Sequence, residues 1–321
     1  MKFRTEVDIP GYPFRIDHRS PVLMMGSCFT DYMGSYLHKY LFDVCINPFG
    51  VIYNPLSIHK ALTAILDKEE YTEDDLELYN DLYFSFNHYT GFSHPDKHKA
   101  LENINRSFKE ARRFIHDAHY LFLTFGTSYV YRYNKSGEIV CNCHKMPASA
   151  FSRERLTPEM ITDALTGLFN RLQQVNRHLK IIFTISPVRH WKDGAHGNQV
   201  SKSILLLAVN RLCSFNPESF FYFPSYEMMM DDLRDYRFYA EDLIHLNNVA
   251  VTYIWEKFAS AFFTDETRQV IEKLDSLLKA FQHKPVHPDS ITHKKFVRER
   301  EKRLTGLKSN YPYLPWSKFN N

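Results

Sequence analysis

The sequence predicts an α/β fold, in which about five buried, mainly parallel strands form a sheet with helices on both faces. Short unbroken apolar runs, typical of strands buried on both faces, alternate with segments that have the three-to-four-residue apolar spacing of helices. Each apolar run ends in glycine or polar residues. This alternation is the pattern of a three-layer α/β/α arrangement, to which a helical C-terminal extension is added.

The elements follow in a regular order. Buried strands are expected at residues 22–25, 42–46, 120–125, 181–185 and 220–223. Helices are expected at residues 29–40, 56–66, 97–118, 158–178, 201–213 and 247–263. Alternating segments predict an edge strand or arm at 3–7, a strand at 82–86, and a hairpin formed by 129–133 and 138–141.

The pattern divides the chain into an α/β domain at residues 1–264 and a basic helical extension at 265–321. Between Lys284 and Lys318 there are nine Lys or Arg residues and three Asp or Glu residues. Such a segment can bind an acidic partner or a membrane surface. We expect instead a solvated helix face packed on its own domain, because this arrangement is more common.

Composition narrows the class of protein. The 321-residue chain is 44% hydrophobic with a net charge of only +3, so its charge gives no argument for a nucleic-acid partner. Neither a membrane span of roughly 20 apolar residues nor a signal peptide is recognisable. Five irregularly spaced cysteines are expected to be reduced thiols, which predicts a cytoplasmic location. An aromatic content of 15% predicts a thick aromatic core, with an aromatic-lined cleft as the alternative.

The turn Gly26-Ser27 is the first candidate for chemistry. An apolar run from Val22 to Met25 stops at Gly26, and a helical pattern begins at Phe29. The Ser27 hydroxyl is therefore expected at the carboxyl edge of the sheet and at the positive end of a helix, where α/β proteins bind ligands. Ser27 is either the N-cap of that helix or a nucleophile that uses this position.

A base and an orienting carboxylate occur together in Asp242-Leu243-Ile244-His245. A separation of three residues lets one turn hold both side chains. Asp242 can then accept the Nδ1 proton of His245 and leave Nε2 free to take a proton from a hydroxyl. A surface Asp–His pair at the start of a helix is the alternative, because this spacing is common.

Together these motifs resemble a known family. Gly26-Ser27-Cys28-Phe29-Thr30 is similar to the N-terminal signature of the GSCFA family, whose fifth residue is usually alanine. Further stretches within residues 20–262 resemble the same family: Asn47-Pro48-Phe49-Gly50, Tyr53-Asn54-Pro55, Gly126-Thr127, Asn142-Cys143-His144-Lys145, Ser186-Pro187-Val188-Arg189-His190, Ser201-Lys202, Tyr236-Arg237-Phe238-Tyr239 and Asp242 to His245.

The resemblance implies an SGNH, or GDSL-like, hydrolase with a three-layer α/β/α fold and esterase-type acyl chemistry. It implies Ser27 as the nucleophile, Asp242 and His245 as its partners, and the Gly50 amide as an oxyanion donor. The chain departs from the SGNH pattern after its central strand, where Gly126-Thr127-Ser128-Tyr129 stands in place of Gly-x-Asn-Asp. The candidates to replace the missing asparagine donor are Asn54, Thr127, Ser128 and Asn142.

These observations predict a serine esterase, or an acyltransferase, that acts on an O-acyl ester of a carbohydrate-like small molecule. Ser27 attacks the acyl carbonyl, the amides of Ser27 and Gly50 hold the oxyanion, and water or another acceptor releases the acyl group. No cofactor or metal is required, and the oligomeric state is not specified. A non-catalytic binding module, motivated by the missing asparagine, and a phosphoesterase with histidine-bound metal are the alternatives.

Other residues near the expected site have competing interpretations. Cys28 is an alternative nucleophile at the helix start, although a small helical cysteine is more often part of a core. Cys141-Asn142-Cys143-His144 suggests zinc, but the sequence has no second cysteine pair. His144, Arg189 and His190 are expected to line the cleft. Arg189 either holds an anionic or polyhydroxyl group or forms a structural salt bridge.

Overall fold

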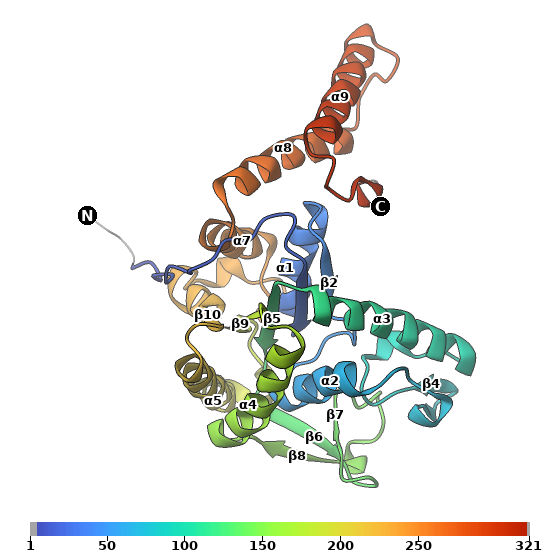
Figure 1. Ribbon diagram of the computed structural model, residues 1–321, viewed down its shortest axis with the longest axis vertical. Coiled ribbons are helices and arrows are strands. Elements are labelled where there is room, and N and C mark those ends of the chain that lie inside the picture. The colour runs from blue at the N-terminus through green and yellow to red at the C-terminus, as the bar shows by residue number, and fades with distance from the viewer. Residues whose placement is uncertain (1–4, 320–321) are drawn as a thin grey trace.

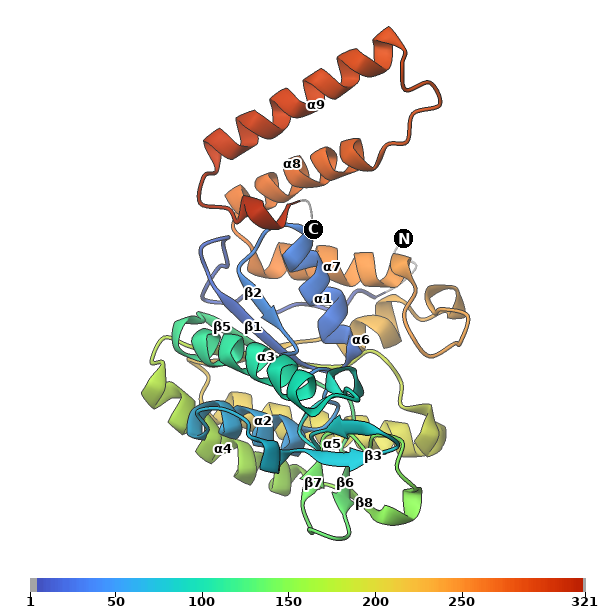
Figure 2. The ribbon, with the colours of Figure 1, turned by 90° about the vertical axis from the view of Figure 1, so that its right-hand side faces the viewer.

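The computed structural model describes residues 5–319 and contains a five-stranded sheet covered by helices on both faces (Figures 1 and 2). Its strand order is β10-β9-β5-β1-β2, and every neighbouring pair is parallel. The strands are β1 (Val22–Gly26), β2 (Val44–Ile46), β5 (Tyr120–Phe125), β9 (Lys180–Ile185) and β10 (Phe220–Phe223). The predicted α/β fold class is confirmed.

Helices connect these strands and continue beyond them. They are α1 (Cys28–Lys39), α2 (Pro55–Asp67), α3 (Lys97–Asp117), α4 (Pro158–Val175), α5 (Gly194–Phe215), α6 (Ser225–Glu227), α7 (Asn248–Phe262), α8 (Asp265–Gln282) and α9 (Ile291–Asn310). Most of the long helices begin at a short polar side chain that accepts a hydrogen bond from an amide of the first turn, as a good N-cap does. These caps are Ser27, Asn54, Asp96, Thr157, Asn247, Thr264 and Ser290.

Side chains that alternate along the central strands pack in two separate hydrophobic cores, one on each face of the sheet. In β1, Leu23 and Met25 pack in the core that α2, α3, α4 and α5 cover. Val22 and Met24 pack in the opposite core, with α1, α7 and α8. Because both faces are covered, the strands are apolar at most positions, which is why they appear in the sequence as nearly unbroken runs. Burying one such side chain contributes about 1.5–3 kcal/mol to folding.

Two small antiparallel sheets lie outside the main sheet. One is the hairpin of β3 (Glu77–Tyr79) and β4 (Leu82–Phe84). The other places β6 (Tyr129–Tyr133) between β7 (Ile139–Val140) and β8 (Phe151–Arg155). Within the segment expected as an edge strand or arm, residues 1–4 lie outside the described part of the chain, and residues 5–7 form no strand.

The C-terminal helices form a hairpin that stands off the domain beside α1 and α7 (Figure 2). Helix α8 buries Val270, Leu274 and Leu277 in the core shared with α1 and α7. Helix α9 packs against α8 and buries only Leu304. The extension is thus attached through α8, and most of the basic surface of α9 faces solvent. No helix between residues 5 and 319 is long and apolar enough to cross a membrane.

Candidate functional site

A cavity of about 250 Å³ lies at the carboxyl ends of β1, β5 and β9. We name it the Ser27 pocket, because Ser27 follows β1 directly and lines it. Parallel neighbouring strands end at the same edge of a sheet, so segments distant in sequence converge here. The lining residues are Ser27, Cys28, Tyr53, Gly126, Ser186, Val188, Arg189, His190, Trp191, Lys192, Ile244 and His245.

Gly26 fixes the position of Ser27. Its backbone has a φ of +146°, and a Cβ atom at this residue would lie 2.2 Å from the carbonyl oxygen of Thr124 in β5. The Gly26 amide donates to Asn47 Oδ1 (2.8 Å), and its carbonyl accepts from the amide of Ile52 (2.9 Å). Only glycine fits this turn. The two hydrogen bonds from the loop after β2 hold Gly26 at its amide and at its carbonyl.

Ser27 is both the N-cap of α1 and part of the pocket wall. Its Oγ accepts a long hydrogen bond from the Phe29 amide (3.4 Å), and its own amide donates to the Thr124 carbonyl (3.1 Å). The amide of Cys28, the first in α1, makes no hydrogen bond to another residue in the described chain. Burial, reinforced by Asp31, raises the pKa of the Cys28 thiol to about 11, which argues against a thiolate nucleophile.

Asp242 and His245 form a hydrogen-bonded pair across one turn. Asp242 Oδ2 accepts from His245 Nδ1 (2.6 Å), and Asp242 Oδ1 accepts from the amides of Ile244 and His245 (both 2.9 Å). These three bonds, chiefly the one from the imidazole, lower the pKa of Asp242 to about 2. Within residues 5–319, His245 Nε2 makes no hydrogen bond, and Ser27 Oγ is not bonded to it. The two side chains therefore share the pocket without a hydrogen bond between them.

Arg189 links the loop after β9 to the Asp242–His245 turn. One guanidinium nitrogen, Nη2, donates to the carbonyl of Leu243 (2.6 Å), and the guanidinium lies over the rings of Trp191 (4.9 Å) and Tyr239 (4.7 Å). Arg189 forms no salt bridge with any described carboxylate. The structural salt bridge that was one of its two expected roles is therefore absent within residues 5–319. The neighbouring His190 also lines the pocket, where burial lowers its pKa.

Seven residues expected at the site do not line the Ser27 pocket: Gly50, Asn54, Thr127, Ser128, Asn142, His144 and Asp242, of which Asp242 is linked to the pocket through its hydrogen bond with His245. The Gly50 amide already donates to the Asn47 carbonyl (2.6 Å). Asn54 caps α2 with its carbonyl oxygen and donates its amide to Ser57 Oγ. The hydroxyls of Thr127 and Ser128 both bond Ser201 Oγ, at 3.2 and 3.1 Å.

Asn142 and His144 belong to a different part of the molecule. Asn142 Oδ1 accepts from the Thr90 hydroxyl (3.2 Å) and the His144 amide (2.8 Å). His144 stacks on Phe84 with ring centroids 4.1 Å apart, and its Nε2 bonds the Ser85 carbonyl (3.1 Å). Among the described residues, no cluster of three or more His, Cys, Asp or Glu side chains could hold a metal ion.

Sequence reasoning quoted Ser201-Lys202 only as a stretch that resembles the family and gave no role to Lys202, which is fully buried beside the pocket. Its Nζ donates to the carbonyls of Gly126 (2.8 Å) and Ser186 (2.7 Å), which follow β5 and β9. A lysine is almost never fully buried without a partner, so nothing in the residue type alone indicates this position. The signal that could have revealed it is the spacing of three and four residues along the buried face of α5: Asn198, Ser201, Lys202, Leu205, Ala208, Val209 and Leu212.

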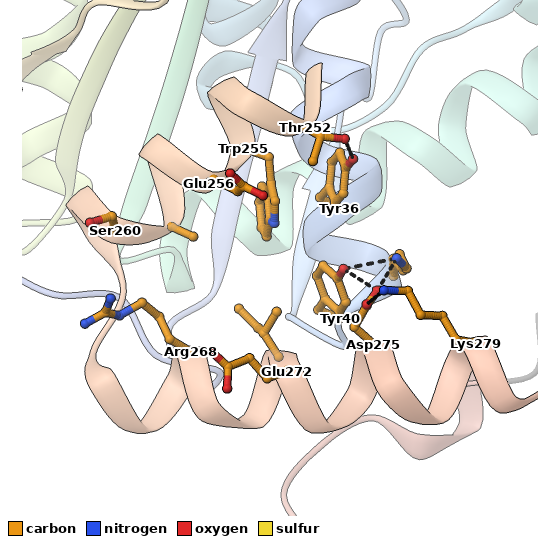
Figure 3. Close-up of a pocket in the computed structure, with 13 residues that line it drawn as sticks. Tyr36, Tyr40, Thr252, Trp255, Glu256, Ser260, Arg268, Glu272, Asp275 and Lys279 are labelled. Carbon is orange, nitrogen blue, oxygen red and sulfur yellow. Dashed lines mark hydrogen bonds and ion pairs between the residues drawn. The ribbon is translucent and has the colours of Figure 1, made fainter. Parts of the chain in front are cut away.

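A larger cavity of about 500 Å³ lies between α1, α7 and α8 (Figure 3). Three of its charged residues are paired with one another: Asp275 accepts hydrogen bonds from Lys39 (2.8 Å) and Tyr40 (2.9 Å) and pairs with Lys279 (2.7 Å). Its lining contains no histidine or cysteine, and Asp275 is already engaged by Lys39, Tyr40 and Lys279, so this cavity lacks a carboxylate-oriented imidazole like the one at His245. Chemistry therefore favours the smaller Ser27 pocket.

Comparison with known proteins gives two matches. Residues 21–258 match the GSCFA family, and residues 274–319 match the GSCFA domain protein, C-terminal domain. No curated protein matches the chain. The first match covers the main sheet and every residue of the Ser27 pocket, while the second starts within α8 and covers α9.

Proposed function

The chain belongs to the GSCFA family, and we propose that its Ser27 pocket is the active site of a serine acyl hydrolase of the SGNH, or GDSL-like, type. One observation carries the proposal. Ser27 and the Asp242–His245 pair come from opposite ends of the domain sequence, yet Ser27 and His245 line the same cavity. The imidazole is already oriented by a carboxylate at Nδ1, which leaves Nε2 to act as a base.

The reaction would proceed in two steps. Ser27 Oγ attacks the acyl carbonyl while its proton moves to His245 Nε2, and Asp242 stabilises the imidazolium. The imidazolium then protonates the departing alcohol, which leaves an acyl-Ser27 ester. Water attacks this ester, giving its proton to His245, and the carboxylic acid and free Ser27 are formed. The low pKa of Asp242 is consistent with a carboxylate that stays ionised throughout.

The oxyanion requires donors other than those expected from the sequence, because the amides of Ser27 and Gly50 are bonded to carbonyls. The Cys28 amide supports the proposal as a replacement: it makes no hydrogen bond to another described residue, begins α1 and belongs to a residue of the pocket wall. Catalysis further requires the exposed Asp242–His245 turn to approach Ser27 when substrate binds. Such hydrogen bonds are often long in free enzymes and shorten in the complex.

The lining of the pocket favours a small ester with a polar alcohol. Tyr53 and Trp191 provide aromatic surface, and Arg189 and Lys192 provide cations that suit a polyhydroxyl or anionic group. A volume of about 250 Å³ limits the buried part to a short acyl chain or one ring. An O-acylated carbohydrate-like molecule fits these features, and an acceptor alcohol in place of water would make the protein an acyltransferase.

The test is hydrolysis of p-nitrophenyl acetate together with labelling of the protein by a fluorophosphonate. We expect wild type to release p-nitrophenol and to be labelled at Ser27. Ser27→Ala should lose both properties, and Asp242→Asn should lower kcat by up to about 10⁴-fold. Cys28→Ala is the matched control beside Ser27 and should keep most of the activity. Hydrolysis that survives in Ser27→Ala would exclude Ser27 as the nucleophile.

A non-catalytic binding module is the second candidate function. The engaged amides of Ser27 and Gly50 favour it, because loss of one oxyanion donor typically costs about 10²-fold or more in rate. Absence of both labelling and hydrolysis in a folded wild-type protein, combined with saturable binding of a sugar or its ester in calorimetry, would support this function over the hydrolase.

A further inference from the structure

Lys202 is a buried cation that has no acidic partner in the described chain. Its side chain is 0% exposed, and its Nζ donates only to the carbonyls of Gly126 (2.8 Å) and Ser186 (2.7 Å). Burial lowers its pKa to about 7. Taking an ammonium out of water has a large free-energy cost even after the protein relaxes. Two carbonyl contacts compensate only part of this cost. Stability of the fold therefore does not explain why a lysine is buried at this position.

The two carbonyls that Lys202 contacts belong to residues of the Ser27 pocket. Gly126 packs against Ser27: a Cβ atom added to Gly126 would lie 3.4 Å from Ser27 Cβ. Ser186 begins the segment that carries Arg189 and His190 into the pocket. One ammonium group therefore joins the two walls of the Ser27 pocket that follow β5 and β9.

The preceding residue on α5 extends this clamp. Ser201 Oγ accepts from the Ser128 amide (2.8 Å) and bonds the hydroxyl of Thr127 (3.2 Å). Adjacent residues of one buried helix turn thus hold three consecutive residues after β5. The remaining strand-end amides, those of Gly126 and Thr127, donate to the carbonyl of Tyr53 (2.7 and 3.0 Å).

The charge of Lys202 also reaches the pocket electrostatically. It lowers the pKa of the Cys28 thiol, against the larger opposing effect of burial, and it contributes to the lowered pKa of His190. Cys28 faces it from α1, His190 from the loop after β9, and the ring of Tyr226 from α6 (5.4 Å). A positive charge enclosed this way stabilises negative charge that develops in the pocket, because little water is present to screen it.

We propose that Lys202 is a positioning residue of the Ser27 site: it clamps the turns after β5 and β9 and supplies the positive potential that favours an oxyanion on the substrate of Ser27. The inference rests on the proposed hydrolase. It assigns to a buried cation part of the task that an asparagine performs in the SGNH pattern. Loss of its proton leaves the clamp with a neutral amine and removes the potential.

The first experiment compares Lys202→Met and Lys202→Arg with wild type in ester hydrolysis. Lys180→Met is the matched control, because Lys180 Nζ also donates to a backbone carbonyl, that of Glu218 (2.8 Å), but at the amino end of β9. We expect Lys202→Met to lower kcat by about 10²-fold with little change in KM. Lys202→Arg, if it folds, should retain more activity and move the alkaline limb of the pH–rate profile to higher pH, since arginine stays charged.

The second experiment does not depend on activity. Hydrogen exchange measured by mass spectrometry should speed up about tenfold or more in peptides 126–128 and 186–190 of Lys202→Met, and not in Lys180→Met. Site-resolved alkylation should show Cys28 reacting more slowly in Lys202→Met at the same pH, because the thiolate loses a nearby cation. Thermal unfolding establishes that each variant is folded.

The outcomes separate the two proposals. If wild type neither hydrolyses esters nor reacts with fluorophosphonate, the hydrolase fails, and the exchange and alkylation results alone decide the role of Lys202. If Lys202→Met hydrolyses esters within threefold of wild type, the positioning role is overturned. Unchanged exchange in both peptides together with unchanged Cys28 alkylation would overturn it as well.

Discussion

At the scale of single residues, three buried histidines outside the pocket affect stability more than chemistry. Burial lowers the pKa of His88 to about 3, and the pKa values of His18 and His144 to about 4. Both ring nitrogens of His88 lack a hydrogen-bond partner, and its ring stacks on Phe49 (4.8 Å). These imidazoles are neutral in the folded protein over a pH range in which the unfolded chain binds protons.

This difference in proton binding makes the folded protein less stable as pH falls. Between pH 6.5 and about 4 the unfolded state binds more protons, so the free energy of unfolding falls as pH falls, by up to about 1.4 kcal/mol per pH unit for each such histidine. We expect His88→Phe to reduce this slope by about 1 kcal/mol per pH unit. It should leave stability at pH 7.5 nearly unchanged, because no hydrogen bond is lost. Urea unfolding from pH 4.5 to 7.5 measures this.

The control for this series is His98→Phe, since the side chain of His98 is 86% exposed. It should leave the slope as in wild type. A slope that is equally steep in His88→Phe and wild type would show that the folded protein already accommodates a charged His88.

Candidate site residues could be predicted from the sequence only where a short local motif indicates their chemistry. Ser27 and the Asp242–His245 turn were found from short spacings, and the structure places Ser27 and His245 in one pocket. The amides available for the proposed oxyanion hole could not be predicted, because an amide's availability depends on which carbonyl it meets in the folded chain. The Gly50 amide meets the carbonyl of Asn47, which no spacing rule reveals.

At the scale of elements, the loop after β9 supports the exposed turn that carries His245. Arg189 holds the Leu243 carbonyl while lying over Trp191 and Tyr239. We expect Arg189→Met to lower kcat for a neutral ester by about 10–10²-fold, because a displacement of about 1 Å at the base has costs of this size. KM for the neutral ester should change little. Steady-state kinetics with a neutral and an anionic ester measure both effects.

The contrast between the two esters identifies the role of Arg189. If it binds an anionic group of the substrate, KM should rise for the anionic ester alone, and kcat for the neutral ester should stay as in wild type. Arg237→Met is the control from the neighbouring segment, since the Arg237 guanidinium pairs with Asp235 in solvent.

Elements with a strong apolar period were predicted, and elements without one were not. Helix α5 begins at Gly194, seven residues before its expected start at 201, because the segment of glycine and polar residues at 194–200 has no apolar stripe. Strand β8 was missed for a similar reason. Its sequence, Phe151 to Arg155, is mostly charged or polar and partly exposed, and pairing with β6 alone makes it a strand.

At the scale of the whole molecule, the carboxylate of Asp275 adds a polar link between the C-terminal hairpin and the domain to the apolar contacts of α8. Asp275 of α8 accepts from Lys39 and Tyr40 of α1 (Figure 3). Burial alone would raise the pKa of Asp275, but hydrogen bonds from Lys279, Lys39 and Tyr40 lower it to about 2. Its stabilising contribution is therefore complete above pH 3.8 and is lost as pH falls through about 2.

We expect Asp275→Asn to loosen the hairpin while the domain stays folded. Limited proteolysis within residues 265–319 should be faster by about fivefold or more, corresponding to about 1 kcal/mol of local stability. Asp265→Asn is the control, because Asp265 is an exposed acid of the same helix whose partner, Arg268, belongs to α8 itself. Equal cleavage rates in wild type and Asp275→Asn would mean that apolar contacts of α8 alone hold the hairpin.

The fold class could be predicted because buried parallel strands have a distinctive composition, but the strand order could not. Which strands become neighbours depends on how the helices and strands of all three layers pack together. Strand β1, for example, pairs with β5 as well as with β2. The extension was expected to pack on the domain. Only α8 does so extensively, and α9 keeps its charged surface in solvent.

The strand order also has a consequence for synthesis. Val22 of β1, near the start of the chain, pairs with Tyr120 of β5, and the His245 turn comes after the last strand of the sheet. A nascent chain leaving the ribosome therefore contains Ser27 long before it contains the base. Such long-range pairing slows folding and leaves strand edges exposed meanwhile. In the proposed hydrolase, the same order would keep the serine without its base until nearly the whole domain has been made.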